Sequence, residues 1–595
     1  MQGVQADEEL LPDQSGWGPL RSRKMRWFGS FTFKIAIAAA IIIAGDIIFW
    51  QRTMLGSGFG LFALVLLAGV LLARSGIVKH IGAWMVAAAG AYYAFALFDD
   101  PSLLSLALFL VAVSVLTLLP AATKGGDGWQ WFQRLIANGL MATLIPFLDF
   151  IKVMKVRFRR RKRTSQRSVL SIFATLFLPV SGSIVFIMLF AAANPILESW
   201  LAGFSFPELD ELLIVRMFLW AAIFWLGWSL LRPRSLKHVA GTFEGRGDAK
   251  IPGVTVQSLK LSLIVFNLIF AAQNMMDVAY LGGFATLPAD ITLAEYAHRG
   301  AYPLIATAIL AGLFTLVTLR PGSTTARDPL IRRLLVLWIA QNIFLVGSSI
   351  ERTLDYVRIY SLTQRRIAAL AWMVLVAVGL ALICWRMLKD KNASWLINSN
   401  VIAAGIVLSI FAVVDTGAIA AGWNVRHAKE VGGEGAKLDL CYLNNLGGSA
   451  LLPLVELEKR ADIEPSFRKR VSVVRNVVQS EVAHAQANDF WTWRNARRLS
   501  DAEQIAGKVK ASNTYDSNYR CDGSQNYREE DAASAVAESA MSDPVVAQPG
   551  QTAGQEAAEY PLPPSPPPVT KQLRKESDQT TKDLRQESLT GAPKQ

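Results

Sequence analysis

Segments of about twenty apolar residues, separated by short loops that carry arginine and lysine, recur along the first two-thirds of this chain. A helix of about 20 apolar residues is long enough to cross a hydrocarbon core about 30 Å thick. We therefore predict an all-α, polytopic transmembrane helix bundle. About eleven spans are expected, at residues 33–50, 61–73, 81–98, 103–119, 169–193, 212–231, 259–276, 302–319, 334–350, 367–388 and 395–419.

Composition agrees with a membrane protein, because 52% of the 595 residues are hydrophobic and only 18% are charged. The net charge of +13 could suggest a nucleic-acid partner. The densest basic block, residues 152–167, instead lies between two apolar segments. Such blocks stay on the cytoplasmic side and contact anionic lipid. We predict the lipid bilayer as the main partner, anionic lipid at residues 152–167, and no nucleic acid.

The charges of the loops alternate along the chain, which predicts an orientation. Basic clusters near residues 21–26, 74–79, 152–167, 232–237, 320–333 and 386–391 fall on one side, and mostly acidic loops fall on the other. By the positive-inside rule the basic side is cytoplasmic. The prediction is a bacterial inner-membrane protein with a cytoplasmic N-terminus and a periplasmic C-terminus. The loop from Glu351 to Arg366 fits least well, because it is mildly basic on the outer side.

One apolar stretch does not fit this alternation. Residues 129–151 could span a membrane, but spanning would place the basic block at 152–167 outside. Trp129, Trp131, Pro146 and Asp149 are typical of a helix that lies at the membrane surface or re-enters it. We predict an interfacial or re-entrant helix here.

The composition changes near residue 424, which predicts five regions. These are a cytoplasmic segment at 1–30, membrane helices 1–4 with the interfacial helix and basic loop at 31–168, membrane helices 5–11 at 169–423, a helical periplasmic domain at 424–530, and a disordered Pro-rich tail at 531–595. Valines at 471, 474, 478 and 482 recur at helical spacing in the domain. The tail is rich in Pro, Ala, Ser, Gln and Glu, which disfavours a packed core.

Two of the three cysteines, Cys441 and Cys521, fall in this domain, while Cys384 lies in an apolar span. A periplasmic location permits a disulfide, although the spacing does not require one. We predict a Cys441–Cys521 disulfide.

Polar side chains inside apolar spans are the candidates for a functional site, because burying them in lipid is costly. Asn267, Asn274 and Asp277 share one helical stripe. Asn342, Ser349 and Arg352 share another, and the remaining candidates at the same outer depth are Glu351, Asp355, His298 and Arg299. One interpretation is an outward-facing polar cavity for a ligand or for protons. The other is hydrogen bonding between helices, with Arg352 paired to Asp277 or Asp355.

Motifs for soluble chemistry are missing from the sequence. The five histidines lack metal-ligand spacing, and no GxxxxGK[ST], G-x-S-x-G, HExxH or CxxC occurs. We therefore predict no metal, no cofactor and no catalytic residue. An enzyme is disfavoured, although chemistry on a lipid-linked substrate stays open.

Several strings resemble an uncharacterised bacterial family of multi-pass membrane proteins, the 4173/4153-like domains of unknown function. They are Ala271–Leu281, Glu295–Pro303, Trp338–Asn342, Arg352–Trp372, Trp423–Val425 and Asp439–Gly447. The resemblance implies an integral inner-membrane protein and assigns no activity. Two functional hypotheses follow: a transporter-like or ligand-sensing protein with an outward-facing polar site, or an envelope scaffold that binds other envelope proteins through its C-terminal domain.

Overall fold

The computed structural model describes residues 31–50, 55–74, 81–121, 126–161, 211–234, 255–281, 323–488, 490–512 and 518–526, with isolated positions in 176–194 and 284–314. All belong to one compact unit, residues 1–526. Over these ranges the chain is helical and has no β-strand beyond a single bridge between Tyr519 and Gln525. The predicted all-α class is confirmed.

A first group of helices packs around one apolar core. Its members are α2 (Phe31–Trp50), α3 (Leu55–Ala73), α4 (Ile81–Asp99), α5 (Leu103–Leu118) and α9 (Glu211–Leu231). Phe109, Val113 and Leu116 of α5 are fully buried in that core. Small residues allow close helix contacts, since a Cβ at Gly60 would clash with the backbone of Phe98.

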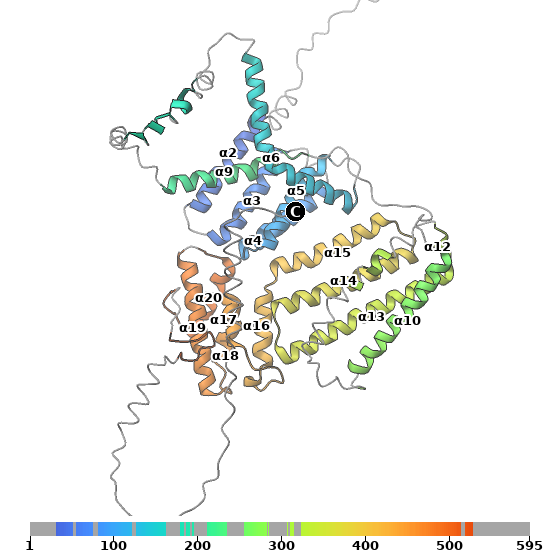
Figure 1. Cartoon of the computed structure of the whole chain (residues 1–595). Coiled ribbons are helices and arrows are strands. Elements are labelled where there is room, and N and C mark those ends of the chain that lie inside the picture. The colour runs from blue at the N-terminus through green and yellow to red at the C-terminus, as the bar shows by residue number, and fades with distance from the viewer. Residues whose placement is uncertain are drawn as a thin grey trace, which may run out of the picture. The chain divides into compact units, whose positions relative to one another are not determined.

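A second group lies side by side in the order α10 (Val256–Leu281), α13 (Pro329–Tyr360), α14 (Gln364–Leu388) and α15 (Ala393–Val413) (Figure 1). Polar caps begin the last three helices. Asp328 accepts hydrogen bonds ahead of Pro329, and Thr363 and Asn392 cap α14 and α15. The apolar core of this group contains Leu263 of α10 and Ile331 and Leu335 of α13, and the short helix α12 (Thr324–Arg327) precedes α13.

Nine of the described helices are long and apolar enough to cross a membrane, and α5 is a shorter apolar helix. Nine of the eleven predicted spans coincide with described helices, while those at 169–193 and 302–319 fall largely outside the described residues. The stretch predicted to be interfacial belongs to α6 (Gly128–Arg161), which has the length of a spanning helix and contains Pro146. These helices indicate a membrane-embedded protein.

The last span ends earlier than expected. α15 stops at Val413, and Asp415 caps a separate helix, α16 (Thr416–His427), by accepting hydrogen bonds from the backbone of Gly417 and Ala418. The predicted boundary at residue 424 therefore falls inside α16. The end of the span is hard to read from the sequence, because Thr416–Trp423 contains no charged residue.

A helical region follows, consisting of α16, α17 (Leu440–Asn445), α18 (Leu451–Glu458), α19 (Pro465–Asn488) and α20 (Trp493–Ala506). We call residues 416–526 the C-terminal domain. Leu443, Leu451 and Leu454 are fully buried against Val471 and Val478 of α19. The valine spacing that predicted a helix thus marks the buried side of α19.

The ends of the membrane helices fall into two sets, and each set defines one face of the helix bundle. The domain face contains Asp46, Ser57, Asp99 and Val413 (helix ends of α2, α3, α4 and α15). Ser57 and Asp99 contact the C-terminal domain, and Val413 accepts a hydrogen bond from its Arg494. Asp46 joins this set because Phe49, near the same end of α2, packs against Phe59 of α3.

The opposite face contains the other ends of these helices. Arg74, directly after α3, donates a hydrogen bond to the carbonyl of Thr117 at the end of α5. Lys34, near the start of α2, lies within electrostatic range of Arg74 and of Arg232 at the end of α9. The two faces are therefore fixed by contacts between helices that are distant in sequence.

Candidate functional site

A ladder of amide hydrogen bonds joins α10 to α13 within their apolar segments. Gln341 donates to the Asn267 side chain at 3.0 Å, and Asn267 donates to the backbone carbonyl of Leu334 at 3.0 Å. Asn274 donates to the carbonyl of Gln341 at 3.3 Å. Each bond crosses from one helix to the other, as expected for polar groups that hold membrane helices together.

The ladder ends at a buried ion pair between Asp277 and Arg352. Asp277 is 1% exposed and Arg352 is 8% exposed. The Asp277 carboxylate also accepts hydrogen bonds from Ser348 at 2.5 Å and from Gln273 at 3.0 Å. Both carboxylate oxygens thus have partners within the protein, which is the condition under which a buried charge is tolerated.

The predicted candidate residues do not all gather here. Asn267, Asn274, Asp277 and Arg352 come together, whereas Asn342 is buried and donates to the carbonyl of Trp338 on its own helix. The others are set apart or not described: Glu351 is exposed, Asp355 forms an exposed ion pair with Arg358, and His298 and Arg299 lie outside the described residues. Arg352 therefore pairs with Asp277, not with Asp355. That a ligand binds at this cluster stays a prediction.

A groove of about 380 Å³ runs beside the ladder. Its lining is mostly apolar, with Asn274, Met275, Val278, Ala340, Gln341 and Phe344. A lining of this kind suits hydrocarbon better than a polar solute. The polar groups of α10 and α13 are thus directed mainly at each other.

A second polar cluster fastens the C-terminal domain to the membrane helices. Arg494 of α20 pairs with Asp99 at 2.6 Å and with Asp100 at 3.0 Å, and it donates to the carbonyl of Val413 at 2.7 Å. The Arg494 side chain is only 12% exposed and that of Asp99 only 9%. One side chain of the domain therefore ties together the ends of α4 and α15.

Further contacts extend this attachment. Arg498 pairs with Asp415, which also accepts a hydrogen bond from Ser449 at 2.8 Å. Burial raises the pKa of Asp415, but the hydrogen bonds from Arg498, Ala418 and Ser449 outweigh it, and the net pKa lies below its ordinary value. The backbone N–H of Trp493 donates a hydrogen bond to the hydroxyl of Ser57 at 3.0 Å. Sequence reasoning missed this cluster, although Arg494, Arg497 and Arg498 at helical spacing beside Trp493 were a readable signal.

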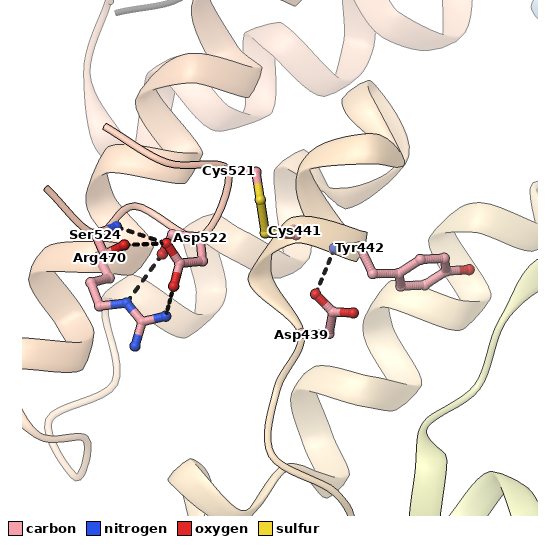
Figure 2. The surroundings of a disulfide bond; sticks show 7 residues. All are labelled: Asp439, Cys441, Tyr442, Arg470, Cys521, Asp522 and Ser524. Carbon is pink, nitrogen blue, oxygen red and sulfur yellow. Dashed lines mark hydrogen bonds and ion pairs between the residues drawn. A yellow bond between two sulfur atoms is a disulfide. The ribbon is translucent and has the colours of Figure 1, made fainter. Parts of the chain in front are cut away.

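Cys441 and Cys521 form a disulfide that links the start of α17 to the chain beyond α20 (Figure 2). Next to it, Arg470 of α19 pairs with Asp522 at 2.6 Å, and Ser524 donates to the same carboxylate at 2.6 Å. The hydrogen bonds from Ser524, together with the charge of Arg470, hold the pKa of Asp522 below its ordinary value. These bonds fix residues 518–526 against α17 and α19.

A cavity of about 290 Å³ lies where the end of α13 meets α16. Trp423 stacks on His427 with ring centroids 3.9 Å apart, and Arg358 and Glu434 bring opposite charges to the lining. The other lining residues are Val357, Ser361, Asn424, Ala428, Gly435 and Ala436. We call this space the junction cavity.

The walls of the junction cavity are held by specific backbone contacts. The Asn424 side chain bonds to both the N–H and the carbonyl of Leu362, at 2.7 and 2.9 Å, which fixes the turn after α13. The N–H of Gly435 bonds to the carbonyl of His427 at 2.9 Å, and a Cβ at Gly435 would lie 2.4 Å from that oxygen. Glycine is therefore required for this loop to close against α16.

The fold and these sites define an all-helical, membrane-embedded protein with a helical C-terminal domain docked at one face. The chain belongs to the family described as "Domain of unknown function (DUF4153)", whose family model matches residues 85–457. This range includes α10, α13, the junction cavity and Cys441. No curated protein and no solved structure matches the chain.

Proposed function

We propose that the chain is a ligand-sensing protein of the bacterial inner membrane, with the junction cavity as its polar, outward-facing site. The observation that carries the proposal is the position of this cavity between a membrane helix and the C-terminal domain. Val357 and Arg358 come from α13, while Trp423 and His427 come from α16, with Glu434 on the loop beyond it. A ligand bound there would contact both parts and could bias how they are arranged.

The chemistry of the cavity suggests a small polar ligand with an apolar surface. The exposed face of Trp423, which is 40% exposed, can stack on a ring. Arg358 and Glu434, which also line the cavity, offer a donor and an acceptor of opposite charge. A saccharide or a small zwitterion fits this combination better than an apolar molecule does.

The outward orientation rests on two supports. A Cys441–Cys521 disulfide is stable in the periplasm and is reduced in the cytosol, which favours a periplasmic domain face. Arg74, Arg232 and Arg234 on the opposite face follow the positive-inside rule for a cytoplasmic surface. The junction cavity would then open toward the periplasm.

Native mass spectrometry of the purified protein tests the proposal, supported by thermal-shift assays with monosaccharides, amino acids and glycerophosphodiester headgroups. We expect a bound or stabilising small molecule with the wild-type protein. Trp423→Ala and Glu434→Gln should abolish its binding, whereas the remote, exposed Lys469→Gln should not. The proposal fails if no compound binds, or if binding survives both cavity variants in folded protein.

A further inference from the structure

The start of α6 and its residue Asp149 both contact helix ends on the opposite face, although α6 is long enough to span a membrane. At its start, Ser394 donates to Asp127 at 2.9 Å and the N–H of Gly128 donates to Asn398 at 2.6 Å. Ser394 and Asn398 lie in the first turns of α15. The other end of α15, at Val413, accepts a hydrogen bond from Arg494 on the domain face. The start of α6 is therefore at the opposite face.

The later part of α6 meets the end of α9. Asp149 pairs with Arg232 and Arg234, both at 3.2 Å, and accepts a hydrogen bond from Trp228 at 3.3 Å. The start of α9 lies at the domain face, because its Arg216 pairs with Asp46. Asp149 is thus also at the opposite face, after 22 residues of helix that would extend about 33 Å if straight.

The side chains of α6 divide into two stripes, as expected for a helix at a surface. Asn138, Ile145 and Asp149 are at most 5% exposed and face the protein. On the other side, exposed apolar residues recur every three or four positions, at Phe132, Ile136, Leu140, Leu144, Phe147 and Phe150. The helix then continues into the basic sequence that begins at Lys152 and reaches Arg161.

From these contacts we infer that α6 lies in the plane of the membrane at the opposite face and binds a surface of anionic lipid. The exposed apolar stripe enters the boundary between headgroups and acyl chains, and the basic end beyond Asp149 attracts anionic headgroups. A protein partner suits this stripe less well, because the neighbouring membrane helices α9 and α15 also expose large apolar side chains and the stripe is followed by positive charge. The inference does not depend on the junction cavity.

Spin labels measure the depth of α6 directly. Single cysteines would replace Phe132, Leu140 and Phe147 in a Cys384→Ser background, in nanodiscs of phosphatidylcholine with one quarter phosphatidylglycerol. An in-plane helix predicts nearly equal depths at the three positions, from oxygen and nickel-chelate accessibility. Ile402 and Ile410 of α15 are the control pair, with the same spacing as Phe132 and Leu140, and their depths should differ clearly. A Leu140 label much deeper than those at 132 and 147 overturns the inference.

The binding of anionic lipid by α6 is tested separately. Wild-type protein should melt several degrees higher in nanodiscs with phosphatidylglycerol than in pure phosphatidylcholine. We expect Lys152→Gln/Lys155→Gln to reduce this difference by at least half. Lys459→Gln/Lys469→Gln, which removes two exposed charges from the C-terminal domain, should leave it unchanged. An equal effect of the two double variants, or no effect of phosphatidylglycerol on the wild type, refutes binding of anionic lipid by α6.

Discussion

The two faces of the helix bundle differ in how their charges are paired. On the domain face, Arg494 and Arg498 are 12% and 13% exposed and pair with carboxylates that are distant in sequence. On the opposite face, Arg232 and Arg234 are 36% and 33% exposed and share the single carboxylate of Asp149. The domain face is thus an interface inside one chain, whereas the opposite face leaves positive charge available to its surroundings.

Arginine side chains of this membrane protein therefore have two separate roles, according to how deeply they are buried. Half-exposed arginines set topology through the membrane and its lipids and add little to stability. Buried arginines with distant partners fix one part of the chain against another, and their loss leaves a carboxylate without compensation. The same residue type should therefore respond very differently to substitution on the two faces.

The largest effect is expected at the ion pair between α10 and α13. Asp277→Asn removes the carboxylate that pairs with the buried Arg352, which should cost about 3–5 kcal/mol of stability. Thermal unfolding in detergent measures the loss. The double variant Asp277→Asn/Arg352→Gln should recover part of it, because the charges of both members of the ion pair are then removed. A single variant as stable as the wild type would show that the pair is not buried in the membrane-embedded protein.

The next largest effect should follow loss of the disulfide. Cys441→Ser removes a bond that joins positions 80 residues apart and should lower the stability of the C-terminal domain by about 2–4 kcal/mol. Limited proteolysis of the domain and thermal unfolding would show the change. Cys384→Ser, in an apolar span, is the control and should change stability much less. If reductant leaves the melting of wild-type domain unchanged, the bond is not formed in the purified protein.

A matched pair of arginine substitutions compares the faces directly. Arg494→Ala removes two ion pairs and a hydrogen bond from a buried site, and should cost about 1.5–3 kcal/mol. Arg232→Ala removes a half-exposed charge, and should cost about 0–1 kcal/mol. Thermal unfolding of both variants under one condition is the measurement. Equal losses would remove the distinction between the two faces.

Acid should loosen the domain through Asp415. Its pKa in the folded protein lies below that of an unfolded aspartate, so the stabilisation is complete above the unfolded pKa of 3.8 and is lost as pH falls through the folded pKa. Burial raises the pKa of Asp100, so the protonation of this second carboxyl group in acid favours the folded state and partly offsets the effect of Asp415. Melting temperatures from neutral pH down to about 3 should fall less steeply for Asp415→Asn than for the wild type. Parallel curves would rule out Asp415 as a source of the acid sensitivity.

Much of the fold follows from local patterns that the sequence displays. Apolar length predicted α2–α5, α9, α10 and α13–α15, because a lipid-crossing helix depends on its own composition. The helical spacing of its valines predicted α19, because this spacing is also a local pattern in the sequence. The break after Val413 was not predicted, since no charge follows Asp415 before Arg426; in the structure Asp415 caps α16 and also meets Ser449 and Arg498 far along the chain.

The candidate sites were predicted less completely. The stripe of Asn267, Asn274 and Asp277 was visible because helical spacing places these residues on one side of α10. The junction cavity was not visible, because Arg358, Trp423 and Glu434 meet only through tertiary packing. The Gly432–Gly435 loop matches no functional motif in the sequence, whereas in the structure it closes the end of α16.

Most depends on sidedness: the start of α6 and Asp149 lie at one face, and the C-terminal domain lies at the other. Single cysteines at Gln130, Lys152 and Lys469, in a Cys384→Ser background, can be labelled with a membrane-impermeant maleimide. In spheroplasts we expect labelling at 469 only, and in inside-out vesicles at 130 and 152 only. Labelling of 130 and 152 from opposite sides, or of 152 and 469 from the same side, would contradict it.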